Sequence, residues 1–89
     1  MTGWDAVPRL HRGVKTAYDD TRDSHVVLFP EGVLVLNETA AAVVGLCDGR
    51  TSVEGIARRL AEEFDGVEAD DVAELVARLV ARRVVDVDG

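Results

Sequence analysis

Apolar and polar residues change their spacing near the middle of the chain. Before Asn37, apolar residues come in short runs, at Val14 to Tyr18, His25 to Phe29 and Val33 to Leu36. The first run alternates with polar positions, which is typical of a half-buried strand. The segment Pro30-Glu31-Gly32 between the other two is typical of a three-residue hairpin loop. The pattern predicts a three-stranded antiparallel meander.

From Asn37 onward, apolar residues recur at helical spacing. Asn37 itself is a good N-cap, and we expect the helix that follows it to end at Gly49. Thr51 begins a Thr-x-x-Glu capping box, which predicts a second helix that ends at Gly66. A third helix is predicted over Ala69–Arg83 from its apolar stripe.

These elements predict an α+β fold, a three-stranded antiparallel β-meander followed by a three-helix bundle like a winged helix-turn-helix. The chain has 89 residues, which fits a single domain over residues 1–89. We expect residues 1–7 to form a flexible N-terminal arm. The segment Val84 to Val87 is a short apolar end that resembles a strand.

The charge of the chain narrows the classes of partner. Ten Lys and Arg residues against seventeen Asp and Glu residues give a net charge of −7. The stretch from Glu62 to Glu74 holds seven acidic residues and no basic one, where a recognition helix would approach DNA. We therefore expect no nucleic-acid partner. No apolar run approaches the roughly 20 residues that span a bilayer, and no signal peptide is visible, so we expect a cytoplasmic protein that binds no membrane.

The residues that could carry chemistry do not form a site. His11 and His25 have no second His or Cys at metal-ligand spacing. Cys47 is the single cysteine, and we interpret it as a small buried apolar residue rather than a nucleophile. Asp23-Ser24 is similar to the modified serine site of an acyl carrier protein, but it precedes a predicted strand instead of a helix. We predict no catalytic, metal or cofactor site, and no enzyme.

The third predicted strand is unusually apolar for a strand at the edge of a sheet. The residues from Val33 to Leu36 are apolar without alternation. An edge strand carries a row of unpaired backbone N–H and C=O groups. Such a strand is either covered by its own chain or suited to accept another strand.

The third predicted helix has an apolar arc of roughly 200°, wider than a core requires. One flank of this arc is made of small residues at i, i+4 spacing, and such a stripe lets another backbone approach closely. Arg78 and Arg82 on or near this helix would hold acidic side chains of a partner. The alternative is that the small residues are simply good helix formers and the arginines are solvated. The small-residue flank consists of Ala69, Ala73, Ala77 and Val80.

Several short motifs follow one another along the chain. They are Pro8-Arg9-Leu10, Asp20-x-Arg22, Val27-Leu28-Phe29-Pro30-Glu31, Leu36-Asn37, Leu46-Cys47-Asp48-Gly49 and Asp71-Val72. Together they resemble the family of pyrroloquinoline quinone (PQQ) biosynthesis protein D, the PqqD family, over Pro8 to Val85. One departure is Phe29, which stands where a Leu is commoner in the family.

The resemblance implies a recognition element for ribosomally made, post-translationally modified peptides (RiPPs). Such a module binds a precursor peptide, which adds as a strand to the third strand and lies against the third helix. In the family the module delivers the peptide to a radical S-adenosylmethionine (radical SAM) enzyme, which joins a Glu and a Tyr side chain of the peptide. The module itself holds no cofactor and performs no chemistry. The implied peptide-binding residues are Val33, Leu34, Val35, Leu36, Ala69, Ala73, Ala77, Arg78, Val80 and Arg82.

Two other interpretations remain open. One is a recognition element from another modified-peptide pathway, such as that of lasso peptides, which shares the Leu-Asn and Asp-Gly motifs. The Asp-x-Arg and Pro-Glu motifs favour the quinone pathway. The other is a dimerisation domain whose apolar edge pairs with a second copy, so that the protein would be a homodimer.

Overall fold

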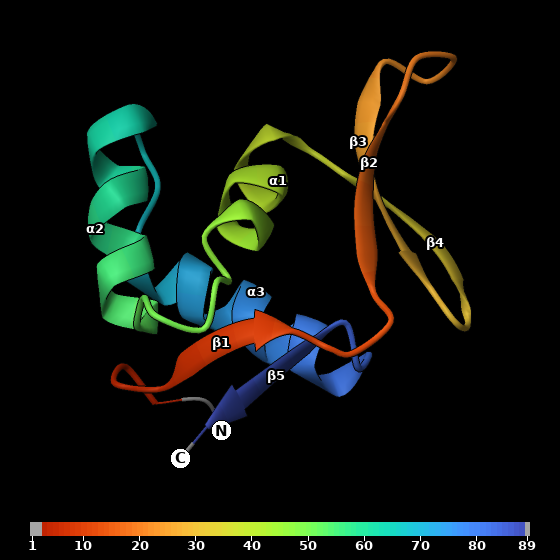
Figure 1. Cartoon of the computed structure of the whole chain (residues 1–89). Helices are drawn as coiled ribbons and strands as arrows, with labels where there is room; N and C mark the ends of the chain where they lie inside the picture. Colours follow the sequence, from red (N-terminus) through yellow and green to blue (C-terminus); the bar gives the residue numbers. More distant parts are fainter. Residues whose placement is uncertain (1–2, 89) are drawn as a thin grey trace.

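The computed structural model describes residues 3–88. Within them, a three-stranded sheet is followed by three helices, and a further pair of strands joins the two ends of the chain (Figure 1). The elements are β1 (Val7–Leu10), β2 (Lys15–Asp19), β3 (Ser24–Phe29), β4 (Gly32–Leu36), α1 (Glu38–Gly45), α2 (Val53–Glu63), α3 (Ala69–Ala81) and β5 (Val85–Asp88). The predicted α+β fold, a three-stranded meander followed by three helices, is confirmed.

The ribbon formed by β1 and β5 was not predicted as a pair. These strands run antiparallel, with Val7 opposite Asp88 and Leu10 opposite Val85. Val85 is almost completely buried, at 1% exposed, and belongs to the core. On the other side of β1, the backbone N–H of Gly49 donates to the carbonyl of Pro8 (3.0 Å). Strand β1 therefore has partners along both of its edges.

The segment that precedes β1 is tied to the start of α2. The backbone N–H of Val53 donates to the carbonyl of Ala6 (2.9 Å), and that of Glu54 donates to the carbonyl of Trp4 (3.0 Å). Ala6 is buried, at 5% exposed. We expected a flexible arm over residues 1–7; residues 3–7 have these contacts, and residues 1 and 2 lie outside the described residues.

The helix boundaries differ from the predicted ones in detail. Asn37 is the N-cap of α1, as predicted, and its side chain accepts a hydrogen bond from the N–H of Ala40 (2.7 Å). Helix α1 ends at Gly45, however, and Gly49 takes its positive φ of 78° in the turn beyond. The capping box at Thr51 is wrong. Ser52 caps α2, because the carboxylate of Asp48 already accepts the Thr51 N–H (2.9 Å).

The later helix ends also shift by a few residues. Helix α2 ends at Glu63 instead of the predicted Gly66. The chain then turns back through Asp65 and Gly66. Helix α3 ends at Ala81 instead of Arg83, because Arg83 adopts a positive φ of 61°. This residue turns the chain into β5, so the apolar end of the sequence becomes a strand of the ribbon.

The three-stranded sheet has the order β2-β3-β4, so both β2 and β4 are outer strands. Successive side chains of a strand point to opposite faces of the sheet. Val27 on β3 is fully buried in the core, on the face that meets the helices, which we call the inner face. Val26 points to the opposite, outer face, where it pairs with Ala17 and Val35.

Strand β2 differs from its predicted half-buried state. Thr16 and Tyr18 are exposed, because α1 packs against β3 and β4. The Tyr18 hydroxyl donates to the carboxylate of Asp23, and its ring meets His25 edge-on with 5.1 Å between centroids. No helix within residues 3–88 is long and apolar enough to cross a membrane.

Candidate functional site

Strand β4 presents an open backbone edge. A two-residue turn, Pro30 and Glu31, joins it to β3 instead of the predicted three-residue loop, because Gly32 already pairs with Phe29 as the first residue of β4. In an antiparallel pair, residues that bond across the pair alternate with residues whose N–H and C=O point away. With the Phe29–Gly32 pair bonded, the outward-pointing backbone groups of β4 are those of Val33 and Val35.

The four predicted residues of β4 divide between the two faces of the sheet. Leu36 is 7% exposed and Leu34 is partly buried against the core, so their side chains hold the strand on the helices. Val33 and Val35 are 57% and 44% exposed. The same two residues that direct backbone groups to the edge therefore also expose their side chains, and the strand is anchored through the other two.

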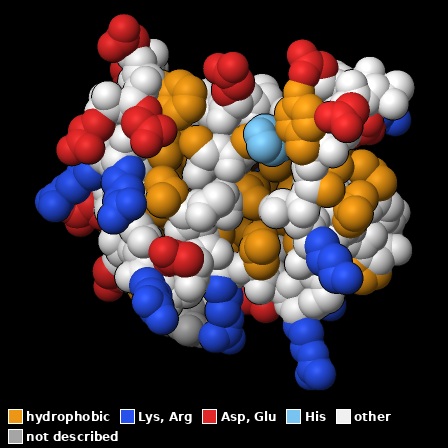
Figure 2. All heavy atoms as spheres, turned by 45° about the horizontal axis from the view of Figure 1, so that its top comes forward, with side chains coloured by type: hydrophobic (Ala, Val, Ile, Leu, Met, Phe, Trp, Pro, Cys, Tyr) orange, Lys and Arg blue, Asp and Glu red, His pale blue; other side chains and the backbone are white. Residues whose placement is uncertain are grey.

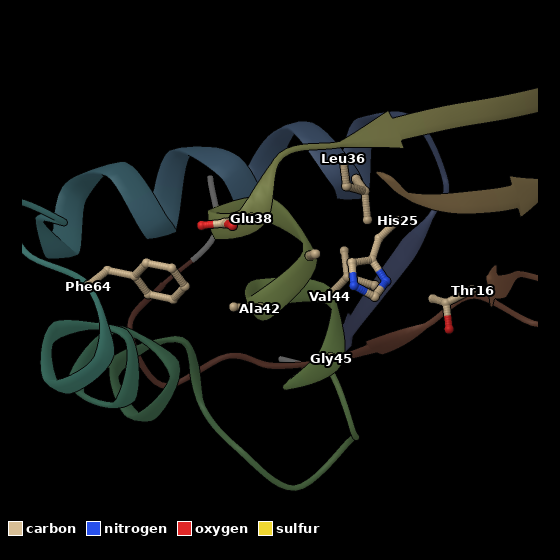
Figure 3. Close-up of a pocket in the computed structure, with 9 residues that line it drawn as sticks. Thr16, His25, Leu36, Glu38, Ala42, Val44, Gly45 and Phe64 are labelled. Carbon is tan, nitrogen blue, oxygen red and sulfur yellow. The ribbon is translucent and has the colours of Figure 1, made fainter. Parts of the chain in front are cut away.

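Helix α3 reaches the sheet at the hairpin between β3 and β4. The guanidinium of Arg82, at the C-cap of α3, lies over the ring of Phe29, 5.9 Å from its centroid. In Figure 3, α3 runs behind Leu36, on the same side of the view as β4, whereas Thr16 of β2 lies on the other side. The open edge of β4 thus starts beside the C-terminal end of α3.

The two flanks of α3 face different neighbours. At 100° per residue, Arg82 projects within about 20° of Leu75 and about 160° from Val80. The flank beside the hairpin is therefore that of Leu75, Arg78 and Arg82. The small residues Ala73 and Val80 lie on the other side of the buried stripe and pack partly against the core.

Ala69 lies apart from the other predicted residues. It is exposed in the first turn of α3, about 20 Å along the helix axis from Arg82 at 1.5 Å per residue. There it lines a cavity of about 470 Å³ with Trp4 and residues of α2. Ala77 lies four residues after Ala73 on the same side of the helix and is partly buried. The structure brings Arg78 and Arg82 to the β4 end of α3 and places the alanines elsewhere.

The C-terminal end of α3 carries a cluster of positive charges, although the net charge of the whole chain is negative. Arg78 is exposed and pairs with Glu74 one turn earlier on α3 (2.9 Å). Arg82 and Arg83 are also exposed at the end of the helix. Cations near a helix C-terminus are favoured by the helix dipole. An acidic side chain that approaches the hairpin end of β4 meets this cluster.

The single cysteine lies in the core, away from this edge. Cys47 is 4% exposed, and its thiol donates to the carbonyl of Val43 (3.2 Å). Burial, and secondarily the negative charge of Asp48, raises the pKa of the Cys47 thiol to about 12. The thiol stays protonated at neutral pH and is a poor nucleophile.

The imidazole of His11 binds the carboxylate of Asp86 (2.9 Å), which joins the end of β1 to β5. His25 lies on β3 beside Tyr18. Within residues 3–88, no group of three or more His, Cys, Asp or Glu side chains is placed to hold a metal ion. Each histidine therefore has a structural neighbour that accounts for it.

A hollow of about 490 Å³ opens on the β2 side of the sheet (Figure 3). It lies between the inner face of the sheet and α1, and Phe64 closes its far end. Figure 2 shows apolar side chains gathered in the middle of this face of the molecule. Sequence reasoning did not find it, since its lining comes from four separate elements. The lining residues are Thr16, His25, Leu36, Glu38, Ala41, Ala42, Val44, Gly45 and Phe64.

Comparison with known proteins gives consistent matches. The family model described as coenzyme PQQ synthesis protein D (PqqD) matches residues 24–85, more than half of the chain. The PqqA binding protein of Xanthomonas oryzae pv. oryzae strain KACC10331 is 44% identical over 84 residues, which cover 91% of each chain. The bifunctional coenzyme PQQ synthesis protein C/D of Methylorubrum extorquens is 40% identical over 84 residues. The match covers 90% of this chain and 22% of that protein, so this chain spans under a quarter of its length.

A solved structure has the same fold. It is the solution NMR structure of the PqqD truncation of Methylobacterium extorquens PqqCD, described as a functional and stand-alone RiPP recognition element. The TM-score is 0.77 at 36% sequence identity, and the match covers 97% of this chain and 95% of the other. The family resemblance found from the motifs is confirmed.

Proposed function

The chain belongs to the PqqD family of coenzyme PQQ synthesis proteins, and from this premise we propose that it binds the precursor peptide of PQQ biosynthesis as a strand added to β4. The observation that carries the proposal is the open edge of β4, where Val33 and Val35 are exposed. Relatives of similar length are named PqqA binding proteins, which supports the same ligand class. These matches favour the quinone pathway over a lasso-peptide pathway.

The mechanism that we propose is positioning. Backbone hydrogen bonds to Val33 and Val35 would give affinity for an extended segment without regard to its sequence. The flank of α3 that carries Leu75, Arg78 and Arg82 would bound the added strand and favour an acidic residue near the hairpin end. The added strand would also cover the unpaired edge, which otherwise invites non-specific pairing.

The further role follows from the family. We propose that the bound peptide is presented to the radical SAM enzyme of the pathway, which performs the chemistry, while this chain performs none. Holding the peptide beside the enzyme would raise its local concentration and restrict its orientation. A ribosomally made peptide is first available in the cytoplasm, where we propose that the chain acts.

The test uses isotopically labelled protein and the Glu- and Tyr-containing precursor peptide encoded nearby. We expect backbone amide shifts to concentrate in β4 and in the last two turns of α3. The variant Val35→Pro removes an N–H that points to the open edge, and proline is tolerated in an edge strand. We expect it to weaken peptide binding at least tenfold by calorimetry.

The matched control is Thr16→Pro, on the other outer strand of the same sheet. Thr16 opposes Val27 across the pair, so by the same alternation its N–H points to the open edge of β2. We expect this variant to bind the peptide as the original does. Equal weakening by both prolines, or a concentration-dependent dimer that excludes the peptide in sedimentation, would overturn strand addition at β4.

A further inference from the structure

The outer face of the three-stranded sheet is apolar although no helix covers it. Leu28, Val33 and Val35 are 40%, 57% and 44% exposed, and they are three of the five large apolar side chains exposed within the described residues. All three point away from the helices, since Val27 and Leu34 between them pack on the core. This surface is separate from the hollow on the inner face.

The strand register arranges these residues in two rows across the outer face. One row runs from Lys15 through Leu28 to Val33. The other runs from Ala17 through Val26 to Val35. Both rows end at β4.

The second row already buries one residue without help from the helices. Val26 is 4% exposed, yet it does not belong to the helix-side core cluster. Its cover comes from neighbouring side chains on the outer face, and cross-strand pairs of β-branched residues stabilise a sheet in this way. A side chain placed beyond Val35 would cover Val35 as Val35 covers Val26.

A strand added at β4 would lengthen each row by one residue. Its side chains alternate between the faces, so every second one lies on the outer face, directly beside Val33 or Val35. We propose that the outer face is a second side-chain contact of the bound peptide, with Val33 and Val35 as the residues that select for apolar or aromatic side chains there. This inference rests on strand addition at β4.

The proposal names the kind of peptide segment that fits. The inner-facing positions of the added strand meet the apolar flank of α3 at Leu75 and the core side of β4 at Leu34. The outer-facing positions meet Val33 and Val35. A segment that fits both faces is a run of at least three consecutive apolar or aromatic residues. A strand contacted only on the inner face would instead alternate apolar with polar residues.

The experiment replaces the two valines with threonine, which keeps the shape and the β-propensity but makes the surface polar. Calorimetry with the same precursor peptide should show a loss of threefold to tenfold for Val33→Thr or Val35→Thr alone. The double variant should lose about thirtyfold. Ala17→Thr is the matched control, because it lies on the same face and in the same row, about 10 Å from the β4 edge at the usual strand spacing. It should bind as the original does.

The outcomes separate this inference from the proposed function. If the original protein binds the peptide and Val35→Pro does not, but the double threonine variant binds normally, strand addition holds and the outer-face contact is wrong. A peptide that fails to bind the original protein sinks both. If the threonines instead abolish a dimer seen in sedimentation and leave peptide affinity unchanged, the outer face belongs to a second copy and the inference is overturned.

Discussion

The two small sheets of this protein place valines of their strands in opposite environments. In the ribbon, β1 is paired with β5 on one edge and bonded to the turn at Gly49 on the other. Val85 of this ribbon is 1% exposed, whereas Val35 of β4 is 44% exposed. The residue type is the same, and the difference lies in whether the chain itself supplies a neighbour. A valine is part of the core where its own chain covers it, and it stays exposed beside an open backbone edge where the chain does not.

A charge placed at each of these two valines tests how far their surroundings differ, and this is the largest effect that we expect. Val85→Asp would bury an unpaired carboxylate, and we expect a loss of more than about 4 kcal/mol of unfolding free energy, enough to unfold so small a domain. The carboxylate introduced by Val35→Asp would remain in contact with water, so this variant should lose about 1 kcal/mol or less of unfolding free energy. Urea denaturation followed by circular dichroism measures both. Similar losses at the two positions would show that β4 is as covered as the ribbon.

The second edge of β1 is bonded to the turn after α1, and a substitution at Gly49 tests how much this contact stabilises the ribbon. This residue has a φ of 78°, where an L side chain is strained, and its N–H reaches Pro8. We expect Gly49→Ala to cost about 1–2 kcal/mol of unfolding free energy. Peptide affinity should not change, because the turn is remote from β4. A drop in affinity without a drop in stability would contradict the separation of the two sheets.

The contact between Arg82 and Phe29 joins the three-stranded sheet to the C-terminal end of α3. We expect Arg82→Ala to cost about 0.5–1 kcal/mol of stability. It should also weaken peptide binding several-fold, less so in high salt, because an acidic residue of the peptide near the hairpin would lose its partner. Arg58→Ala is the control, since it removes one exposed arginine of the same charge, but on α2. Loss of affinity in the control would indicate a general charge effect.

The smallest expected effect concerns Asp48, whose carboxylate accepts the N–H groups of Arg50 and Thr51. These backbone hydrogen bonds lower the pKa of Asp48 below its ordinary value. A lowered folded-state pKa contributes stability above the unfolded pKa, and this stability is lost as pH falls through the folded pKa. Asp48→Asn should therefore melt slightly lower at neutral pH, and the difference should begin to shrink at about pH 4 and vanish once the pH is below the folded-state pKa of Asp48. A difference that persists in acid would contradict this cause.

Local signals explain what the sequence could predict. Asn37 caps α1 because its side chain reaches an N–H three residues later, and that spacing is visible in the sequence. The hairpin at Pro30 and Glu31 is equally local. Pairing of Val7–Leu10 with Val85–Asp88 has no local signal, because the partners are separated by most of the chain. Thr51 and Ser52 are both good caps, and the choice depends on partners outside the helix: the Asp48 carboxylate accepts the Thr51 N–H, and the Trp4 carbonyl accepts the Glu54 N–H.

Of the two elements predicted to form the candidate site, the sequence indicated the exposure of β4 but not which flank of α3 lies beside it. Lack of alternation over Val33 to Leu36 pointed to β4, and that strand is indeed an exposed edge. On α3 the helical wheel shows two flanks but not which one faces the sheet. The contact of Arg82 with Phe29 settles the facing flank, and it depends on how the hairpin packs on the helix end.

Antiparallel pairing of β1 with β5 sets Val7 opposite Asp88, so the two ends of the described chain leave the domain at one corner (Figure 1). Any polypeptide joined there, before the first strand or after the last, would start from the same place. The edge of β4 lies on the other side of the molecule in that view. Another domain could therefore be fused through a short linker at either end of this domain without blocking the open edge of β4.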